Sequence, residues 1–154
     1  MTSIRRGRGS EASRALPLQY WGVRRVLGDG WSIDLYGDWT AERAKGGGTT
    51  WCAPGRTILV VPGAPWRCAD GADIIASLDA HLPPGPTLKL GEGGRGGIGH
   101  RAAWVYHHDG DVGSTLHGYT FIDETYLETV FTDTHSGDLR WAYDAWRSVT
   151  RSAT

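Results

Sequence analysis

The sequence predicts an α+β fold, an antiparallel β-sheet covered on one face by two amphipathic helices. Three observations lead to it. Apolar and polar residues alternate in several short segments, apolar residues recur every three or four positions in two others, and short turns link consecutive strands. The 154 residues are enough for one domain whose core needs neither disulfide nor metal. We expect a disordered basic tail over residues 1–15 and a single domain over 16–154.

The first predicted strand covers residues 31–36. Trp31, Ile33 and Leu35 alternate there with polar side chains, as on a half-buried strand. A second, more buried strand is predicted over residues 57–61, which are almost entirely aliphatic. Both segments border turn-forming glycines, which favours a strand in each.

Other parts of the chain carry a different pattern. Residues 71–82 are predicted as a helix that Asp70 or Asp73 could cap, because their apolar side chains share one face. The Gly-rich segments 42–56 and 91–99 are predicted as loops. A short helix or strand is predicted over residues 16–27.

In the second half of the chain, three strands and a helix are predicted. The strands cover residues 101–108, 114–123 and 126–132, and Asp109-Gly110 signals a hairpin between the first two. The helix runs over about 138–150, and its apolar stripe places Trp146 in the core. The stripe consists of Leu139, Ala142, Tyr143, Trp146 and Val149.

This order of elements, over about residues 28–150, resembles the Mog1/PsbP-like α/β/α sandwich. The most similar stretches are residues 118–123, 126–129 and 141–148. The resemblance implies a mostly non-enzymatic protein, such as a binding module, an adaptor, a secretion-linked chaperone or an immunity-like protein. It assigns no functional residue, because these stretches carry packing and not chemistry.

The charges are distributed unevenly along the chain. Residues 102–139 contain seven acidic side chains and no Lys or Arg, whereas the first 25 residues contain six Arg and one acid. From residue 26 onward, 10 basic and 16 acidic groups leave a formal charge of −6. This balance favours a basic protein partner and makes nucleic acid an unlikely one.

No motif in the chain predicts a cofactor or a metal ion. Gly91–Gly96 fits G-x-G-x-x-G, but a strand follows it where a dinucleotide site needs a helix. Trp51–Gly55 resembles a Trp-Cys-x-Pro-Cys redox motif without its second cysteine. His107 and His108 are adjacent on a predicted strand, so they point to opposite faces.

The cellular location is predicted from what the sequence lacks. No stretch reaches the roughly 18 apolar residues of a membrane helix. No apolar segment follows the basic N-terminus, as a secretory signal would require. We therefore expect a cytoplasmic protein in which Cys52 and Cys68 are free thiols.

Two functions remain open at this point. The favoured one is a non-enzymatic, immunity- or adaptor-type protein that neutralises or escorts a basic toxin or effector. Its predicted contact residues are Asp109, Asp111, Glu124, Glu128, Tyr119, Tyr126 and Trp104. The alternative is a small ligand-binding or hydrolytic domain that uses the loops at 37–68. Its predicted pocket residues are Trp39, Trp51, Cys52, Arg56 and Trp66.

Overall fold

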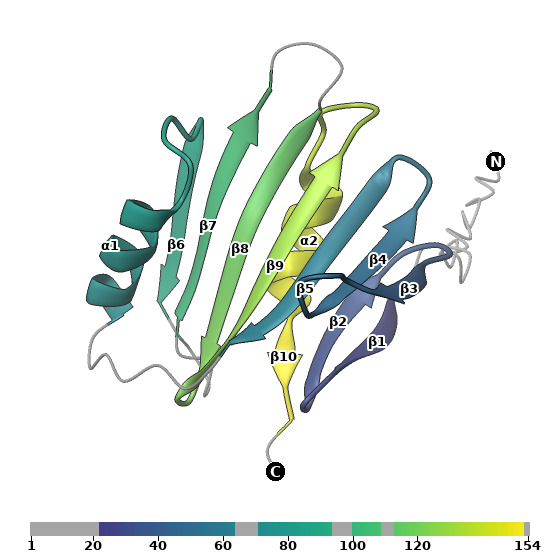
Figure 1. The fold of residues 1–154 in the computed structure, drawn as a ribbon, viewed down its shortest axis with the longest axis horizontal. Coiled ribbons are helices and arrows are strands. Elements are labelled where there is room, and N and C mark those ends of the chain that lie inside the picture. Colours follow the sequence, from purple (N-terminus) through teal and green to yellow (C-terminus); the bar gives the residue numbers. More distant parts are fainter. Residues whose placement is uncertain (1–21, 64–70, 94–99, 109–112, 153–154) are drawn as a thin grey trace, which may run out of the picture.

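The computed structural model describes residues 22–63, 71–93, 100–108 and 113–152. Most of them belong to a seven-stranded antiparallel sheet with the strand order β3-β4-β5-β9-β8-β7-β6 (Figure 1). Its strands are β3 (Thr40–Arg43), β4 (Thr49–Ala53), β5 (Arg56–Gly63), β9 (Thr125–Asp133), β8 (Ser114–Ile122), β7 (His100–His107) and β6 (Leu88–Gly93).

A smaller sheet has the order β1-β2-β10 and is also antiparallel. Its strands are β1 (Val23–Gly28), β2 (Trp31–Leu35) and β10 (Thr150–Arg151). Two helices, α1 (Gly71–His81) and α2 (Arg140–Ser148), complete the described part of the chain. The content is therefore mostly β, consistent with the broad α+β prediction.

The main core lies between one face of the large sheet, helix α2 and strand β2. Alternate residues of β5, β7, β8 and β9 point into it, as the two-residue period of a strand requires. Figure 1 shows α2 behind the large sheet, across β8 and β9. The largest fully buried side chains of this core include Trp31, Phe131 and Trp146.

The opposite face of the sheet holds a second, aromatic cluster, and α1 packs there. Leu78 and Leu82, from α1 and the residue after it, pack against the cluster. The Trp104 indole N–H donates to the Asp79 carboxylate at 2.9 Å, and the Tyr106 hydroxyl donates to the Pro83 carbonyl at 2.9 Å. The prediction that both helices cover one face is wrong, because α1 and α2 pack on opposite faces.

The segments with strong periodicity were predicted correctly. Strands β2, β5, β7, β8 and β9 and both helices lie within a few residues of their predicted bounds.

The predictions of two Gly-rich loops were wrong in part. The segment 42–56 contains β4 and the end of β3, and the segment 91–99 begins inside β6. Strand β3 is exposed and β4 is half-buried along its whole length, so backbone pairing and not alternating burial identifies these two strands. The predicted tail, residues 1–15, lies outside the described residues.

Removing the Asp79 carboxylate is expected to loosen α1. The pKa of Asp79 lies below its usual range because Lys89 and the Trp104 indole both donate hydrogen bonds to it. In Asp79→Ala, the buried Trp104 indole loses its acceptor. We expect faster amide hydrogen exchange across α1 and no change in α2, measured by mass spectrometry. The matched control is Asp144→Ala, an exposed acid on α2. Unchanged exchange in α1 would show that Asp79 does not hold the helix.

Candidate functional site

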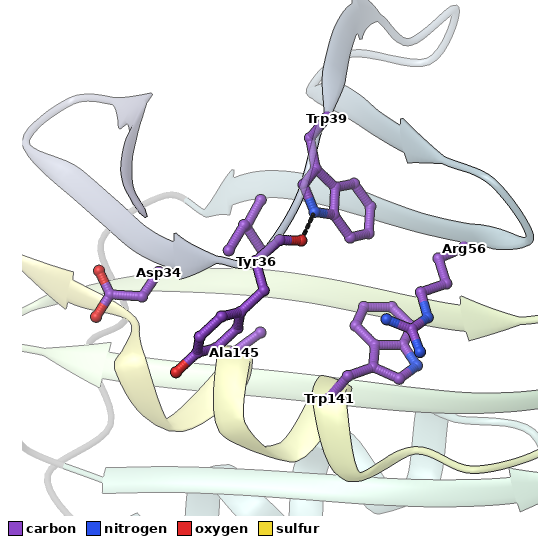
Figure 2. A pocket seen from close by; sticks show the side chains of 7 residues that line it. Asp34, Tyr36, Trp39, Arg56, Trp141 and Ala145 are labelled. Carbon is purple, nitrogen blue, oxygen red and sulfur yellow. Dashed lines mark hydrogen bonds between the residues drawn. The ribbon is translucent and has the colours of Figure 1, made fainter. Parts of the chain in front are cut away.

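A small surface pocket lies where β5 begins, β9 ends and α2 begins. We call it the Arg56 pocket, and Figure 2 shows the side chains that line it. The pocket has a volume of about 20 Å³. Its lining residues are Asp34, Leu35, Tyr36, Trp39, Arg56, Trp141 and Ala145.

Arg56 is held in place on two sides. It is the first residue of β5 and pairs in register with Asp133, the last residue of β9. Its Nε lies 3.4 Å from Oδ2 of Asp133. Its Cζ lies 4.8 Å from the centroid of the Trp141 ring, a cation–π contact visible in Figure 2. The side chain is still 42% exposed, so a rigid guanidinium faces solvent.

Asp133 is the buried centre behind this pocket, since its side chain is only 2% exposed. Its Oδ1 accepts the backbone N–H groups of His135 (2.9 Å) and Ser136 (3.0 Å). Its Oδ2 accepts the Trp141 indole N–H at 2.9 Å, besides its contact with Arg56. Burial acts to raise the pKa of Asp133, but these hydrogen bonds and the Arg56 charge outweigh it and lower the pKa. Asp133 is therefore ionised at neutral pH.

The aromatic walls of the pocket are equally fixed. The Trp39 and Trp141 ring centroids are 5.8 Å apart, and Trp141 also meets Phe131 edge to face at 5.9 Å. The Trp39 indole N–H donates to the Tyr36 carbonyl at 2.9 Å, the dashed line in Figure 2. The Trp39 side chain and the preceding loop therefore hold a set position over the pocket.

This arrangement is suited to recognition. A volume of about 20 Å³ holds a group the size of a water molecule or a side-chain tip, whereas pockets for small-molecule ligands usually measure about 300–1,000 Å³. No nucleophilic Ser, Cys or Lys lines the pocket. Within the described residues, no group of three or more His, Cys, Asp or Glu side chains is placed to hold a metal ion.

The structure brings together only some residues of the predicted alternative pocket. Trp39 and Arg56 both line the Arg56 pocket. Trp51 packs against the main core instead, and the half-buried Cys52 follows it on β4 and points to the opposite face. Trp66 lies outside the described residues.

Two aromatic residues of the predicted acidic contact surface are buried. Trp104 is 1% exposed and Tyr119 is 5% exposed, so neither can act as a surface anchor. Burial raises the pKa of the Tyr119 hydroxyl above its usual range, and the Glu128 carboxylate opposite it on β9 raises it further. Glu128 and Tyr126 are themselves only half-buried.

Of the remaining acids of that prediction, the structure describes only Glu124. Glu124 is exposed in the turn between β8 and β9. Asp109 and Asp111 lie outside the described residues.

Asp133 and Trp141, which hold Arg56 in place, were not among the predicted site residues, and neither were the lining residues Asp34, Leu35, Tyr36 and Ala145. A local signal for Asp133 does exist in the sequence. It ends a strand and is followed by Thr134-His135-Ser136, and an Asp in that position often accepts the N–H groups two and three residues later. Trp141 lies beside the apolar stripe of α2, at the boundary between the buried and the exposed face of the helix.

A second hollow lies at the other end of β5. It is an open groove of about 420 Å³, and Trp31 forms a buried part of it. The Arg151 Nε donates to the Asp29 carbonyl at 3.1 Å, and its Cζ lies 5.8 Å from the Trp31 ring centroid. The lining residues are Asp29, Gly30, Trp31, Pro62, Gly63, Thr125 and Arg151. None of the predicted site residues that the structure describes lines this groove.

Comparison of the sequence with protein-family models and with curated proteins finds no match. Among the described residues, no helix combines the length and apolar character needed to cross a membrane. We therefore infer the function from the geometry of the pocket.

Proposed function

We propose that this protein is a non-enzymatic protein-binding domain of the immunity or adaptor type, which contacts its partner through the Arg56 pocket. The observation that carries the proposal is the rigid Arg56–Trp141–Trp39 cluster at the surface. Trp and Arg are enriched among the few residues that dominate binding energy in protein interfaces. A pocket sized for one side-chain tip is what such a contact needs.

The arrangement of layers supports the same class. Helix α1 on one face of the sheet, with α2 and β2 on the other, makes three layers. This agrees with the proposed resemblance to the Mog1/PsbP-like sandwich, in which binding functions prevail. Fold alone does not assign function, so the proposal depends mainly on the residues of the Arg56 pocket.

For the partner we propose a basic protein, such as a toxin or effector that this domain neutralises or escorts. The support is the formal charge of −6 over residues 26–154. Dispersed acids such as Glu124 and Glu128 would then speed association and select the partner, and the pocket would supply the close contact. The cytoplasm is the proposed location.

A matched pair of arginine variants tests the role of the pocket. The partner is captured from lysate of the native cell and its affinity is then measured with purified protein. We expect Arg56→Gln to weaken binding about tenfold or more, the size of an interface hot spot. Arg43→Gln removes the same charge from exposed strand β3 and should bind like the unchanged protein. Equal affinities of all three proteins would exclude the pocket as the contact.

The open groove favours a second candidate function, the binding of a small ligand. Its volume of about 420 Å³ is within the range of ligand pockets, and Arg151 offers a cation there. A small anionic ligand that raises the melting temperature of the unchanged protein but not of Arg151→Gln would support this candidate. The same ligand should act equally on Arg56→Gln, because that residue lies outside the groove.

A further inference from the structure

The Arg56 guanidinium has unused hydrogen-bonding capacity. A guanidinium carries five N–H donors, and the contact with Asp133 is made through Nε at 3.4 Å. Among the described residues, the two terminal nitrogens of Arg56 make no hydrogen bond. With 42% of the side chain exposed, these donors can reach a ligand in the pocket.

Two of the acids around the pocket are already paired with other arginines. Asp34, which lines the pocket, accepts a hydrogen bond from Arg24 at 2.9 Å. Asp138 is paired with Arg140 at 2.6 Å. Asp133 shares its charge among two backbone N–H groups, the Trp141 indole and Arg56. The Arg56 charge is balanced in part by Asp133, and it also helps to lower the pKa of Asp138, so what the pocket offers a ligand is the exposed terminal N–H groups of Arg56.

The guanidinium is also pre-organised for a planar anion. The contacts with Trp141 and Asp133 restrict the guanidinium, so less side-chain entropy is lost when a ligand binds. Its paired terminal N–H groups match the two oxygens of a carboxylate. The space of about 20 Å³ suits a group of that size, and Trp39 and Tyr36 can cover an apolar stem.

From these observations we infer that the Arg56 pocket binds a carboxylate, carried by an acidic side chain or by the C-terminus of the partner polypeptide. This inference rests on the proposed function and names the group that the pocket accepts. One inserted acidic group is compatible with a partner that is basic overall, because steering depends on net charge and docking depends on local contacts.

Three short peptides test the inference on the whole protein. Ac-Gly-Glu-Gly-NH2 carries only a side-chain carboxylate, Ac-Gly-Leu-Gly-OH only a terminal one, and Ac-Gly-Gln-Gly-NH2 carries none. The indole N–H signals of Trp141 and Trp39 and the Nε–H signal of Arg56 are followed by NMR during titration. We expect saturable shifts in the millimolar range with one or both carboxylate peptides, as a single charge-assisted pair supplies. The peptide that binds more tightly identifies the source of the carboxylate.

Variants separate this site from general charge effects. Arg56→Gln should abolish the shifts, whereas Arg43→Gln should leave them unchanged. Equal shifts with the glutamine peptide, shifts that persist in Arg56→Gln, or no saturation up to roughly 100 mM would each overturn the inference. If partner binding depends on Arg56 while the carboxylate peptides do not bind, the proposed function stands and the carboxylate assignment is wrong. If the peptides bind but partner affinity ignores Arg56, the carboxylate site stands and the proposed function fails.

Discussion

Replacing Trp146 with alanine is expected to lower the free energy of unfolding by about 3–5 kcal/mol, the range for a buried tryptophan. The side chain is 0% exposed and lies in the main core on α2. Its ring lies directly on the backbone of Gly118, where a Cβ atom would come within 2.5 Å of the indole. Its N–H donates to the Tyr119 carbonyl at 3.4 Å. Alanine leaves a cavity between α2 and β8 that the rigid sheet cannot close.

Urea denaturation at fixed pH measures this change. Val26→Ala is the control, because Val26 is 76% exposed and its loss should change stability by less than about 0.5 kcal/mol. Trp146→Phe should lie between the two, since it keeps an aromatic ring in the same space. A loss below about 1 kcal/mol for Trp146→Ala would contradict the assignment of α2 to the main core.

Trp146 also shows why part of the fold could be predicted from the sequence. Residues that face a continuous core must repeat with the period of their element, so the stripe of α2 and the alternation of β2 are visible in one sequence. Strands β3 and β6 lie at the edges of the sheet. An edge strand need not bury either face, and all four residues of β3 are exposed, so β3 shows no two-residue period and resembles a loop in the sequence.

The amphipathic patterns of α1 and α2 do not determine which face of the sheet each helix covers. A helix with an apolar face must cover a sheet, but its pattern does not say which side of the sheet it covers. The strands between α1 and α2 bury apolar side chains on both faces, mostly aromatic ones on one face and mostly aliphatic ones on the other. Both faces were therefore available, and the structure uses one for each helix.

The residues of the Arg56 pocket could likewise be predicted only in part from the sequence. Trp39 and Arg56 were predicted together because they are near each other in the sequence. Asp133 and Trp141 lie 77 and 85 residues after Arg56, and only the pairing of β5 with β9 brings them next to it. No spacing rule connects residues that far apart, so this half of the site could not be predicted without the topology.

Asp133→Asn is the second large change that we expect, with a loss of about 1–3 kcal/mol in the free energy of unfolding. Asparagine can still accept the N–H groups of His135 and Ser136 through one oxygen. Its amide nitrogen would then face the Trp141 indole N–H and the Arg56 guanidinium, both of which are donors. The variant places donors against donors in a buried position, which is more costly than losing a surface ion pair.

The dependence on pH provides an independent check of this expectation. The pKa of Asp133 is lower in the folded protein than its usual value of about 3.9, so between these two values the unfolded chain binds more protons. The stability that Asp133 contributes is therefore complete above about pH 4 and is lost as the pH falls through the folded pKa. The difference in stability between the unchanged protein and Asp133→Asn should shrink over that interval, because asparagine does not titrate.

Urea titrations between about pH 2 and pH 7 measure both the loss of unfolding free energy in Asp133→Asn and its dependence on pH. Asp138→Asn is the matched control. Its carboxylate also has a lowered pKa through its hydrogen bonds with Arg140, but the pair is exposed and should contribute little to stability. A gap between the unchanged protein and Asp133→Asn that stays constant over the whole pH range would show that the asparagine acts through packing and not through the lost charge. It would also remove Asp133 as the electrostatic support of Arg56, because the pocket depends on an ionised carboxylate at its base.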